Sequence, residues 1–568
     1  MLFEGKFLSE SEKTNQQISD EELSDPNKIP YKKLKVLLVD PQRPFLIMMK
    51  GVLTTFGIRD VDFSYNGESA LRSCRQKEYD LLMVEYNLGS KNGTQLLEEL
   101  RILKLIKPET LFIIVSAETD RAVILNTMEM APDDYIIKPF SQRLIDSRLQ
   151  KAWGMRKALS AIHSFLDKDN LDDAIAECRQ LVKAKNRYSA VALQILTGLL
   201  CDKSTHQDAV DILIPILRQR NLPWANLTLA RAKLGLNLLD EAEEILLALI
   251  KSQPTNIQAI DLLAKVYLEN DQNELAKDTL DRSLELSPLS MKRHQFMVEI
   301  AQANDDIELV KNSYGQVLTL SRRSVHTGTK HLFNYTRSII DNVAICEEAK
   351  DINKLQNELT STLHKAKLEE GRALDVPYST YEGVIQAQLQ SAKGENLVSK
   401  KTLMEAIHSF CDENDQWNLP DELAPDACIT LLNLNDFELA SVFAKQLDSN
   451  SEIAQELNAR LNDDNVLIKK SEFAKITRQG IEAYTNNNHI EALELFTQAL
   501  KLSPVNSGAV LNVAQGQISL MLENKKYIKL LSADCKDSFR ILNGMKLSKP
   551  HQKRFNKLRK DFDTLMDK

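Results

Sequence analysis

The stretch Tyr79-Asp80-Leu81-Leu82-Met83-Val84-Glu85 places a run of apolar residues directly before an acid. A short apolar run that is bounded by polar residues is typical of a strand buried on both faces of a parallel sheet. Residues 34–39 and 111–116 have the same character, and shorter β-rich runs lie at 61–64 and 135–137. The sequence therefore predicts five strands, three of them deep in a core.

Segments with the spacing of amphipathic helices separate these strands. They lie at residues 43–56, 67–77, 93–104, 119–130 and 142–153. This alternation predicts an α/β domain with a five-stranded parallel sheet that is doubly wound, as in flavodoxin-like folds. Ligands bind such sheets at the carboxyl ends of the strands, so we expect the residues that close the strands to carry the chemistry. These residues are Asp40, Glu85, Ser116 and Lys138.

Beyond about residue 155 a helical repeat replaces the strands. Alanine recurs at intervals of 35, 33 and 34 residues, and two prolines that end helices are 34 residues apart. A small side chain lets two antiparallel helices approach closely, so this period predicts an all-α solenoid of helix pairs. The alanines are Ala174, Ala209, Ala242 and Ala276, and the prolines are Pro254 and Pro288.

A second copy of this frame occurs near residue 500. Its spacing resembles the signature of tetratricopeptide repeats, which are helix pairs of about 34 residues. The resemblance also covers the repeats before residue 320. Residues 321–470 are helical but off-period, and we interpret them as an irregular helical region with degenerate repeats. The signature positions of the second copy are Gly480, Ala492, Phe496, Ala499 and Pro504.

These patterns divide the chain into segments on either side of the irregular region. Residues 1–30 are polar and mildly acidic, which favours a disordered tail. Residues 31–153 form the α/β domain, and residues 155–320 and 471–548 carry the tetratricopeptide-type repeats. The amphipathic segment 549–568 is interpreted as a helix that caps the solenoid. The alternative is a basic helix that binds a membrane or a partner.

Four segments of the α/β domain are similar to the signature segments of bacterial response-regulator receiver domains. In that family, two adjacent acids after strand 1 and an aspartate after strand 3 hold Mg²⁺, and the aspartate accepts a phosphoryl group from a kinase histidine. A hydroxyl, a lysine and an aromatic side chain respond to the phosphoryl group. The segments are Val36-Leu37-Leu38-Val39-Asp40, Tyr79 to Glu85 as quoted above, Val115-Ser116-Ala117 and Asp133-Asp134-Tyr135-Ile136-Ile137-Lys138-Pro139-Phe140.

The resemblance implies a role for four positions of this chain. It makes Asp40 the first acid of the pocket and Ser116 the hydroxyl that binds the phosphoryl group. Lys138 is then the phosphoryl-binding cation, and Tyr135 is the aromatic residue that changes orientation when the domain switches.

Two positions depart from the receiver pattern. Pro41 stands where a second acid is expected and offers no side-chain oxygen to Mg²⁺, which needs near-octahedral oxygen ligands at about 2.0–2.1 Å. Glu85 replaces the phospho-accepting aspartate and carries its carboxylate one methylene farther out. Misplacement by about 1 Å can cost about 100-fold in rate. We therefore expect a degenerate acceptor, no resident metal and no cofactor. Mg²⁺ would bind only if the receiver retained activity.

Two roles for Glu85 are open at this stage. Its carboxylate could reach Lys138 and Ser116 and imitate the phosphorylated form, which would lock the receiver in one state. Alternatively, Glu85 and Lys138 could pair in an inert polar crevice, because an unpaired buried lysine would be costly. An outward-facing Tyr135 would argue against the locked state.

Composition and motifs exclude several classes of function. A net charge of −8 provides no field for nucleic acid or anionic membranes. No apolar stretch reaches the roughly 18 residues that span a bilayer, and the N-terminal residues do not have the pattern of a secretory signal. We therefore expect a cytoplasmic protein without membrane insertion. The sequence contains no phosphate loop, nucleophile elbow or metal-ligand motif, so we expect no enzymatic activity.

The combination predicts a non-enzymatic adaptor of bacterial two-component signalling. A pseudo-receiver that docks on a sensor histidine kinase or phosphotransfer partner would restrain phosphorelay to the cognate response regulator. The layout resembles auxiliary two-component proteins that join a receiver to tetratricopeptide repeats. Two alternatives remain. One is a response regulator that phosphate switches and whose output binds protein. The other is a scaffold for pilus, secretion or chemotaxis assembly, in which the receiver forms a homodimer.

Overall fold

The computed structural model describes residues 29–322, 324–412, 416–447, 452–545 and 547–566. A tail is predicted for residues 1–30, of which residues 1–28 lie outside the described residues. Ile29 is buried in the core beside the sheet. None of the described helices is long and apolar enough to cross a bilayer. The chain forms two compact units, the first made of Met1–Asp305 with Thr319–Thr327 and the second of Asp306–Leu318 with Gly328–Lys568.

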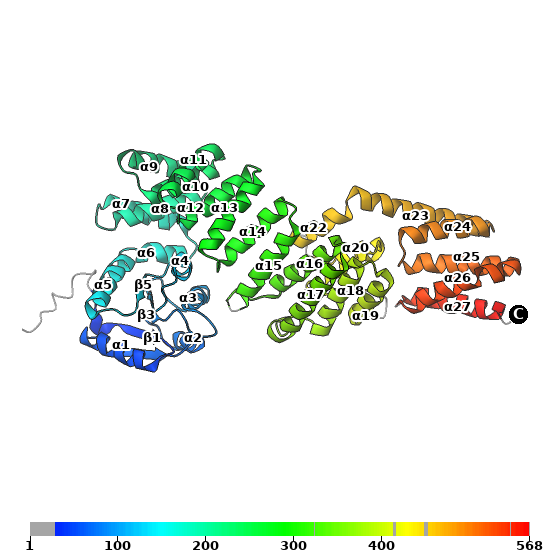
Figure 1. Ribbon diagram of the computed structural model, residues 1–568, viewed down its shortest axis with the longest axis horizontal. Coiled ribbons are helices and arrows are strands. Elements are labelled where there is room, and N and C mark those ends of the chain that lie inside the picture. Colours follow the sequence, from blue (N-terminus) through cyan, green and yellow to red (C-terminus); the bar gives the residue numbers. More distant parts are fainter. Residues whose placement is uncertain (1–28, 323, 413–415, 448–451, 546, 567–568) are drawn as a thin grey trace, which may run out of the picture. The chain divides into compact units, whose positions relative to one another are not determined.

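The first unit begins with a five-stranded parallel sheet in the order β2-β1-β3-β4-β5, with helices on both faces (Figure 1). The predicted doubly wound α/β domain is confirmed. The strands are β1 (Lys35–Val39), β2 (Asp60–Ser64), β3 (Leu81–Val84), β4 (Leu111–Ser116) and β5 (Asp134–Ile137). The helices are α1 (Arg43–Thr55), α2 (Gly67–Gln76), α3 (Gly93–Ile102), α4 (Arg121–Glu129) and α5 (Gln142–Ala158).

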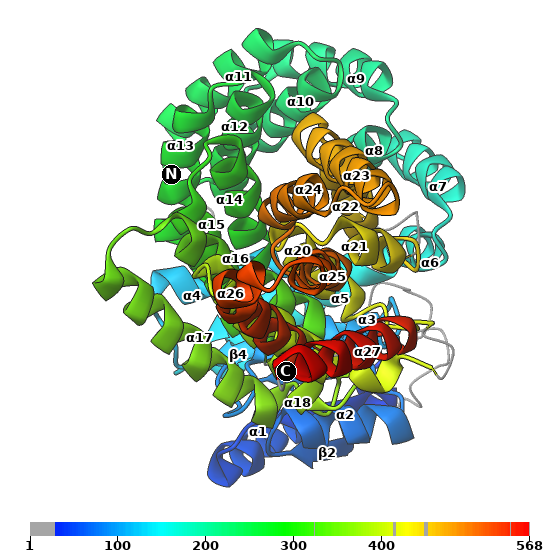
Figure 2. The ribbon, with the colours of Figure 1, turned by 90° about the vertical axis from the view of Figure 1, so that its right-hand side faces the viewer.

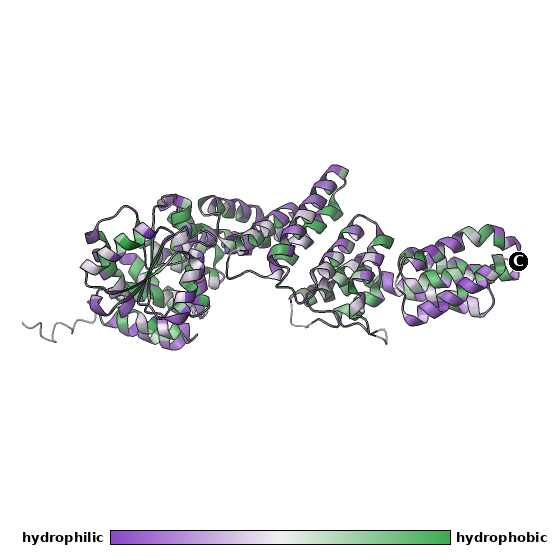
Figure 3. Ribbon diagram, turned by 90° about the horizontal axis from the view of Figure 1, so that it is seen from below, coloured by the Kyte–Doolittle hydropathy of each residue, from purple (hydrophilic) through white to green (hydrophobic). Residues whose placement is uncertain are grey.

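Alternate residues of β1 point into two separate cores, one on each face of the sheet. Val36 and Leu38 face the core that α1 and α5 share, whereas Leu37 and Val39 face the core that α2 and α3 share. Side chains alternate between the faces of a strand, so a strand that is covered on both sides must be apolar throughout. Figure 3 shows this as hydrophobic colour along the strands. Polar side chains are left to the edges of the sheet.

Helices α6 to α14 follow the sheet and pack in chain order (Figures 1 and 2). The repeated alanine is the fourth residue of every second helix and is fully buried each time, in Ala174, Ala209, Ala242 and Ala276. As predicted, α11 and α13 each end two residues before a proline, Pro254 and Pro288. The helices are α6 (Ser160–Asp167), α7 (Leu171–Lys183), α8 (Ser189–Asp202), α9 (His206–Gln219), α10 (Pro223–Gly235), α11 (Leu239–Ser252), α12 (Ile257–Glu269), α13 (Asn273–Leu286) and α14 (Met291–Ala303).

A left-handed turn residue recurs with the same period, and the sequence analysis did not identify it. In each case a non-glycine residue with positive φ lies two residues before the helix that carries the alanine. Residues other than glycine adopt this conformation rarely, and Asn and Asp do so most readily. These residues are Asp169, Ser204, Asn237 and Asp271, and the same turn occurs in the second unit at Asn435 and Asn487.

The second unit is helical, and one continuous core joins α16 to α22. This region contains most of the residues predicted to be irregular. Tyr381 is fully buried in its centre. The helices are α15 (Ile307–Ser321, up to residue 318 in this unit), α16 (Thr329–Ile345), α17 (Ala349–Glu369), α18 (Tyr378–Ala392), α19 (Asn396–Ile407), α20 (Ala424–Asn433), α21 (Phe437–Ala444), α22 (Glu452–Leu461), α23 (Asp464–Thr485), α24 (His489–Leu502), α25 (Ser507–Glu523), α26 (Lys526–Asn543) and α27 (Lys549–Met566).

The predicted signature positions near residue 500 lie where α23 and α24 pack together. Ala492, Phe496 and Ala499 are buried on α24, and Pro504 follows the end of that helix. Gly480 is buried on α23, and a Cβ at this position would lie 2.7 Å from ring carbons of Phe496. The glycine therefore sets how closely the two helices approach.

Replacing Gly480 with alanine is expected to lower the free energy of unfolding by about 1–3 kcal/mol, because the added methyl group overpacks a filled contact. Gly516 on α25 is the matched control, since a Cβ there would lie 3.5 Å from Leu493, an ordinary contact distance. Gly516→Ala should be neutral or stabilise by about 0.5–1 kcal/mol. Denaturant midpoints of the two variants test this, and equal midpoints would contradict it.

Candidate functional site

The predicted site residues gather at the carboxyl edge of the sheet. Val39 of β1 pairs with Val84 of β3, and the next residue along each strand is an acid, Asp40 or Glu85. Asp40 is 2% exposed, and its Oδ1 accepts a hydrogen bond of 2.7 Å from the backbone N–H of Gln42. The parallel register thus places both carboxylates side by side, as predicted.

Glu85 is engaged through both of its carboxylate oxygens. Oε1 accepts hydrogen bonds from the hydroxyl of Ser116 and, at 2.8 Å, from the backbone N–H of Tyr86. Oε2 lies 2.6 Å from Nζ of Lys138. The side chain is only 12% exposed. The longer carboxylate therefore reaches the hydroxyl and the ammonium group at the same time.

Lys138 joins the two acids of the pocket. Its Nζ lies 2.7 Å from Oδ2 of Asp40 in addition to its contact with Glu85. The same Nζ lies 3.6 Å from the centre of the Phe45 ring, a cation–π contact contributed by α1. One positive charge is thus held by two carboxylates and an aromatic face. Pro41 is exposed at the rim and contributes no polar side-chain atom.

Tyr135 lies partly buried beside this network. Its hydroxyl donates a hydrogen bond of 3.0 Å to the backbone oxygen of Glu118, in the loop that leads from β4 to α4. Burial raises the pKa of the phenol, so the hydroxyl keeps its proton at neutral pH. The side chain is therefore tied to the loop before α4 by a hydrogen bond.

The donors of this pocket do not fit Mg²⁺. The ion takes oxygen ligands in near-octahedral geometry. The pocket has two carboxylates in place of the family's three, because Pro41 stands where the second acid after β1 is expected. Both carboxylates face the ammonium group of Lys138. A cation would have to displace this amine or bind against it.

Gly93, which the sequence analysis did not identify, packs closely against the backbone of Glu85. A Cβ at this first residue of α3 would lie 2.8 Å from Cδ1 of Ile114 and 2.9 Å from the backbone oxygen of Glu85. Its N–H donates a 2.7 Å hydrogen bond to the backbone oxygen of Tyr86. Glycine is required here because β3 and the start of α3 approach too closely for any side chain.

A buried arginine connects the receiver-like domain to the helices of the same unit, which the sequence did not reveal. Arg293 on α14 is 5% exposed. Its Nη2 lies 2.7 Å from Oε1 of Glu129 at the end of α4, and its Nε lies 2.9 Å from Oδ1 of Asp261 on α12. His326 makes a second connection, with Nε2 2.8 Å from Oε1 of Glu98 on α3.

Comparisons with known proteins agree with the fold of the N-terminal domain. Residues 36–150 match the family described as "Response regulator receiver domain". The probable chemotaxis protein CheY of Rhizobium etli is 24% identical over 125 residues, which cover 22% of this chain and 96% of that protein. The alkaline phosphatase synthesis transcriptional regulatory protein PhoP of Bacillus subtilis is 29% identical over 141 residues, 25% of this chain and 57% of that protein.

Among solved structures, a two-component response regulator from Clostridium difficile is 25% identical, covers 21% of this chain and 95% of its own, and gives a TM-score of 0.20. The family match of residues 36–150, rather than this structural likeness, identifies the N-terminal domain of this chain as a response regulator receiver domain of the two-component type. A long all-helical region follows it.

Replacing Lys138 with methionine is expected to destabilise the receiver domain by roughly 2–3 kcal/mol. The change leaves Asp40 and Glu85 facing each other without a counter-ion, and the loss falls short of the full penalty of a buried pair because Lys138 is 17% exposed. Lys151→Met, at an exposed position of α5, is the control and should change stability by less than about 0.5 kcal/mol. Equal unfolding midpoints for the two variants would contradict the prediction.

Proposed function

We propose that this chain is a non-enzymatic adaptor of two-component signalling. Its receiver domain is a pseudo-receiver that docks on a sensor histidine kinase or phosphotransfer protein without accepting phosphate. It thereby restrains phosphorelay from that partner to the cognate response regulator. The helical region, proposed to consist of tetratricopeptide-type repeats, provides further protein-binding surface.

The contacts of Glu85 are the observation that carries this proposal. In receivers that this domain resembles, the hydroxyl and the lysine bind the phosphoryl oxygens. Here the Glu85 carboxylate contacts both of these side chains. One oxygen accepts a hydrogen bond from Ser116, and the other pairs with Lys138. This favours the locked state over inert pairing, because inert pairing with Lys138 alone would leave Ser116 uninvolved. The hydrogen bond from the Tyr135 hydroxyl to the loop before α4 also supports the locked state.

An exposed apolar surface on α1 offers a place for a partner to dock. Ile47 is 56% exposed and Met48 is 47% exposed, on the helix that also carries Phe45. Large apolar side chains exposed next to each other are typical of protein-binding surfaces. A docked pseudo-receiver that cannot be phosphorylated would occupy the surface of the kinase that binds receivers. It would thereby exclude the response regulator that accepts the phosphoryl group.

The test begins with full-length protein as bait in native lysate, with mass spectrometry to identify bound proteins. A captured kinase is then purified, autophosphorylated with labelled ATP and mixed with its response regulator. We expect the wild-type chain to slow transfer of the label and to remain unlabelled itself. Label on the wild-type chain, or transfer at an unchanged rate, would contradict the proposal. Capture of pilus or secretion components without a kinase would favour a scaffold instead.

The variant Ile47→Glu/Met48→Glu is designed to separate docking from folding, because it adds charge to an exposed surface only. We expect it to abolish both kinase capture and inhibition. Leu530→Glu on α26 is the matched control, since Leu530 is a comparably exposed apolar residue at 67% exposure. The control should behave as the wild type.

A further inference from the structure

Residues 524–568 carry a net charge opposite to that of the chain as a whole. They contain thirteen Lys and Arg and five Asp, with no Glu, whereas the whole chain has 72 Lys and Arg against 80 Asp and Glu. The two helices of this segment, α26 and α27, both pack against α25 around a common core (Figure 1). Positive charge is therefore concentrated on one pair of helices in the second unit.

Helix α27 separates its apolar residues from three of its lysines. Lys553, Lys557 and Lys560 follow each other at intervals of four and three residues, which places them on one side of the helix. All three are exposed, and within the described residues none of them forms an ion pair. The apolar side of the helix is buried in the core, at Phe555, Leu558 and Phe562. The lysine side is left to meet a partner.

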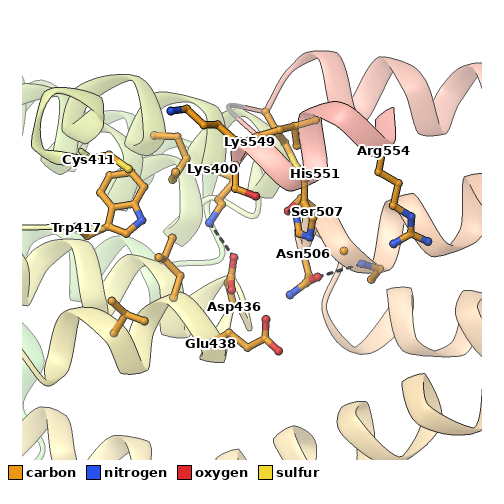
Figure 4. A pocket seen from close by; sticks show the side chains of 18 of the residues that line it. Lys400, Cys411, Trp417, Asp436, Glu438, Asn506, Ser507, Lys549, His551 and Arg554 are labelled. Carbon is orange, nitrogen blue, oxygen red and sulfur yellow. Dashed lines mark hydrogen bonds and ion pairs between the residues drawn. The ribbon is translucent and has the colours of Figure 1, made fainter. Parts of the chain in front are cut away.

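Two other cationic side chains of α27 are used inside the fold. Arg554 has its Nη2 2.7 Å from Oδ1 of Asn512 and its Nε 3.0 Å from Oε1 of Gln515, both on α25. Nδ1 of His551 lies 2.9 Å from the hydroxyl of Ser507. Figure 4 shows both side chains at the wall of a pocket between the helices of this unit. These contacts hold α27 on α25 and do not involve the three exposed lysines.

Helix α26 has a cationic side of its own. Lys529, Lys536 and Arg540 are spaced by seven and four residues, so they lie on one side of the helix, and each is exposed. The exposed Lys525 and Lys526 stand at the start of the helix. Within the described part of the chain, these four lysines form no ion pair. We call the four lysines of α26 and the three of α27 the basic surface.

The acidic side chains of this segment leave most of that charge uncompensated. Asp537 lies 3.2 Å from Arg540 in a surface ion pair, and such pairs contribute little to stability. Asp534 and Asp563 are exposed, and Asp561 is partly buried. In the residues that the structure describes, none of these three aspartates pairs with a lysine of the basic surface. The basic surface therefore keeps its positive charge.

Two leucines are exposed beside these lysines. Leu522, near the end of α25, is 63% exposed, and Leu530 on α26 is 67% exposed. Leu530 lies four residues after Lys526, so the two side chains are neighbours on the helix surface. Lysines on the polar face with leucine beside them are typical of helices that lie in the interface of an anionic lipid bilayer. The composition of the basic surface favours a lipid partner.

The features that bind nucleic acid are not found among the described residues of this surface. Single strands are held by aromatic side chains that stack on the bases, whereas the aromatic rings of this segment are buried or partly buried. Duplexes are read largely through the planar guanidinium group of Arg, whereas the basic surface consists of lysines. Lysine is a compact point charge, which suits many phosphates in no fixed arrangement. The aromatic residues are Tyr527, Phe539, Phe555 and Phe562.

We infer that the basic surface of α26 and α27 binds the surface of an anionic lipid bilayer. The lysines contact lipid phosphates, and Leu522 and Leu530 enter the headgroup region. The association is peripheral, because the apolar side of α27 stays in its own core. The net charge of −8 belongs to the whole chain, so the acidic remainder is repelled and the molecule is oriented with this helical pair toward the lipid. The inference does not rest on the proposed receiver function, because none of its residues lies in the receiver domain.

Co-sedimentation of the full-length protein with vesicles tests the inference. One set of vesicles is pure phosphatidylcholine, and the other has equal parts of phosphatidylcholine and phosphatidylglycerol. We expect binding to the anionic vesicles only. Raising the salt from about 0.1 M to about 1 M should abolish it, because the Debye length falls from about 10 Å to about 3 Å. Equal binding to both sets, or tighter binding to a DNA duplex or a polyglutamate peptide than to the anionic vesicles, would overturn the inference.

Substitutions on α27 test the role of charge. Lys553→Gln/Lys557→Gln/Lys560→Gln should weaken partitioning onto anionic vesicles about 100-fold, because each lysine near an anionic surface contributes roughly fivefold. The corresponding triple substitution with arginine keeps the charge and should bind as the wild type does. Loss of binding in the arginine variant would contradict a role for charge alone.

A matched control changes three exposed lysines of α17 in the same unit. Lys350→Gln/Lys354→Gln/Lys365→Gln removes the same charge and should leave partitioning unchanged. Equal partitioning of the two glutamine variants, at unchanged unfolding temperatures, would overturn the inference. The α27 glutamine variant should still slow phosphotransfer from the purified kinase, because that assay contains no vesicles. Failure of the lipid inference is thereby distinguished from failure of the proposed function.

Discussion

The double substitution Pro41→Asp/Glu85→Asp is expected to turn the receiver domain into one that takes up phosphate. The first change supplies the missing acid, and the second draws the carboxylate back by one methylene and frees Ser116 and Lys138. Since misplacement by about 1 Å can cost about 100-fold, we expect at least about a 100-fold gain in labelling over the wild type. Labelling from acetyl phosphate in a buffer with Mg²⁺ measures it.

The single substitutions are the controls for this experiment. Glu85→Asp alone should increase labelling less than the double substitution does, because Pro41 still provides no oxygen ligand for Mg²⁺. Pro41→Asp alone should gain little, because the Glu85 carboxylate still holds Lys138 and Ser116. If the wild-type chain takes up as much label as the double variant, and Glu85→Gln abolishes that label, then Glu85 is itself an acceptor and the pseudo-receiver interpretation is wrong.

The Arg293→Met variant is expected to loosen the connection between α4 and α14. It leaves Glu129 and Asp261 without their counter-ion, and breaking a buried pair from one side costs about 3–5 kcal/mol. Because 1.4 kcal/mol corresponds to a factor of ten, a loss at the lower end would speed hydrogen exchange in α4 by about 100-fold. Hydrogen–deuterium exchange resolved by peptide measures this loss.

Arg282 provides the comparison for Arg293. It lies on α13 and donates a 2.9 Å hydrogen bond to the backbone oxygen of Pro254 at the surface. Arg282→Met should leave exchange in α4 unchanged. In a second control, Arg293→Met combined with Glu129→Gln and Asp261→Asn should recover part of the protection, because no uncompensated acid then remains. Similar exchange in the two arginine variants would show that the buried ion pairs do not hold α4.

The architecture of the receiver domain could be predicted from local patterns alone. Strands buried on both faces must be apolar along their whole length, so runs such as residues 81–84 stand out from amphipathic helices. Parallel strands end at one edge of the sheet, and this predicts that Asp40, Glu85, Ser116 and Lys138 lie together. The repeat period likewise predicted which alanines are buried.

The connections between distant residues could not be predicted in this way. Arg293 and Glu129 are 164 residues apart, and no periodicity relates them. The choice between a locked and an inert Glu85 depends on the conformation of one side chain. Residues 321–470 show no regular period from which to predict their packing, and the helices α16 to α22 there share one core, which includes Tyr381. The left-handed residues at helix turns were visible in the sequence at a regular spacing, but single Asn, Asp and Ser residues are common in any turn.

The Glu85 carboxylate has a consequence for how such a signal would end. A phosphorylated receiver keeps its state only until its acyl phosphate is hydrolysed, so its lifetime is chemical. The Glu85 carboxylate is joined to the chain by carbon–carbon bonds, which are not hydrolysed. Its contacts with Ser116 and Lys138 therefore have no chemically limited lifetime. If the chain restrains phosphorelay as proposed, mass action makes the strength of that restraint depend on the number of copies of the chain relative to its partner. Under the same proposal, the synthesis, dilution and proteolysis of the chain, and not phosphatases, would set how long the restraint lasts.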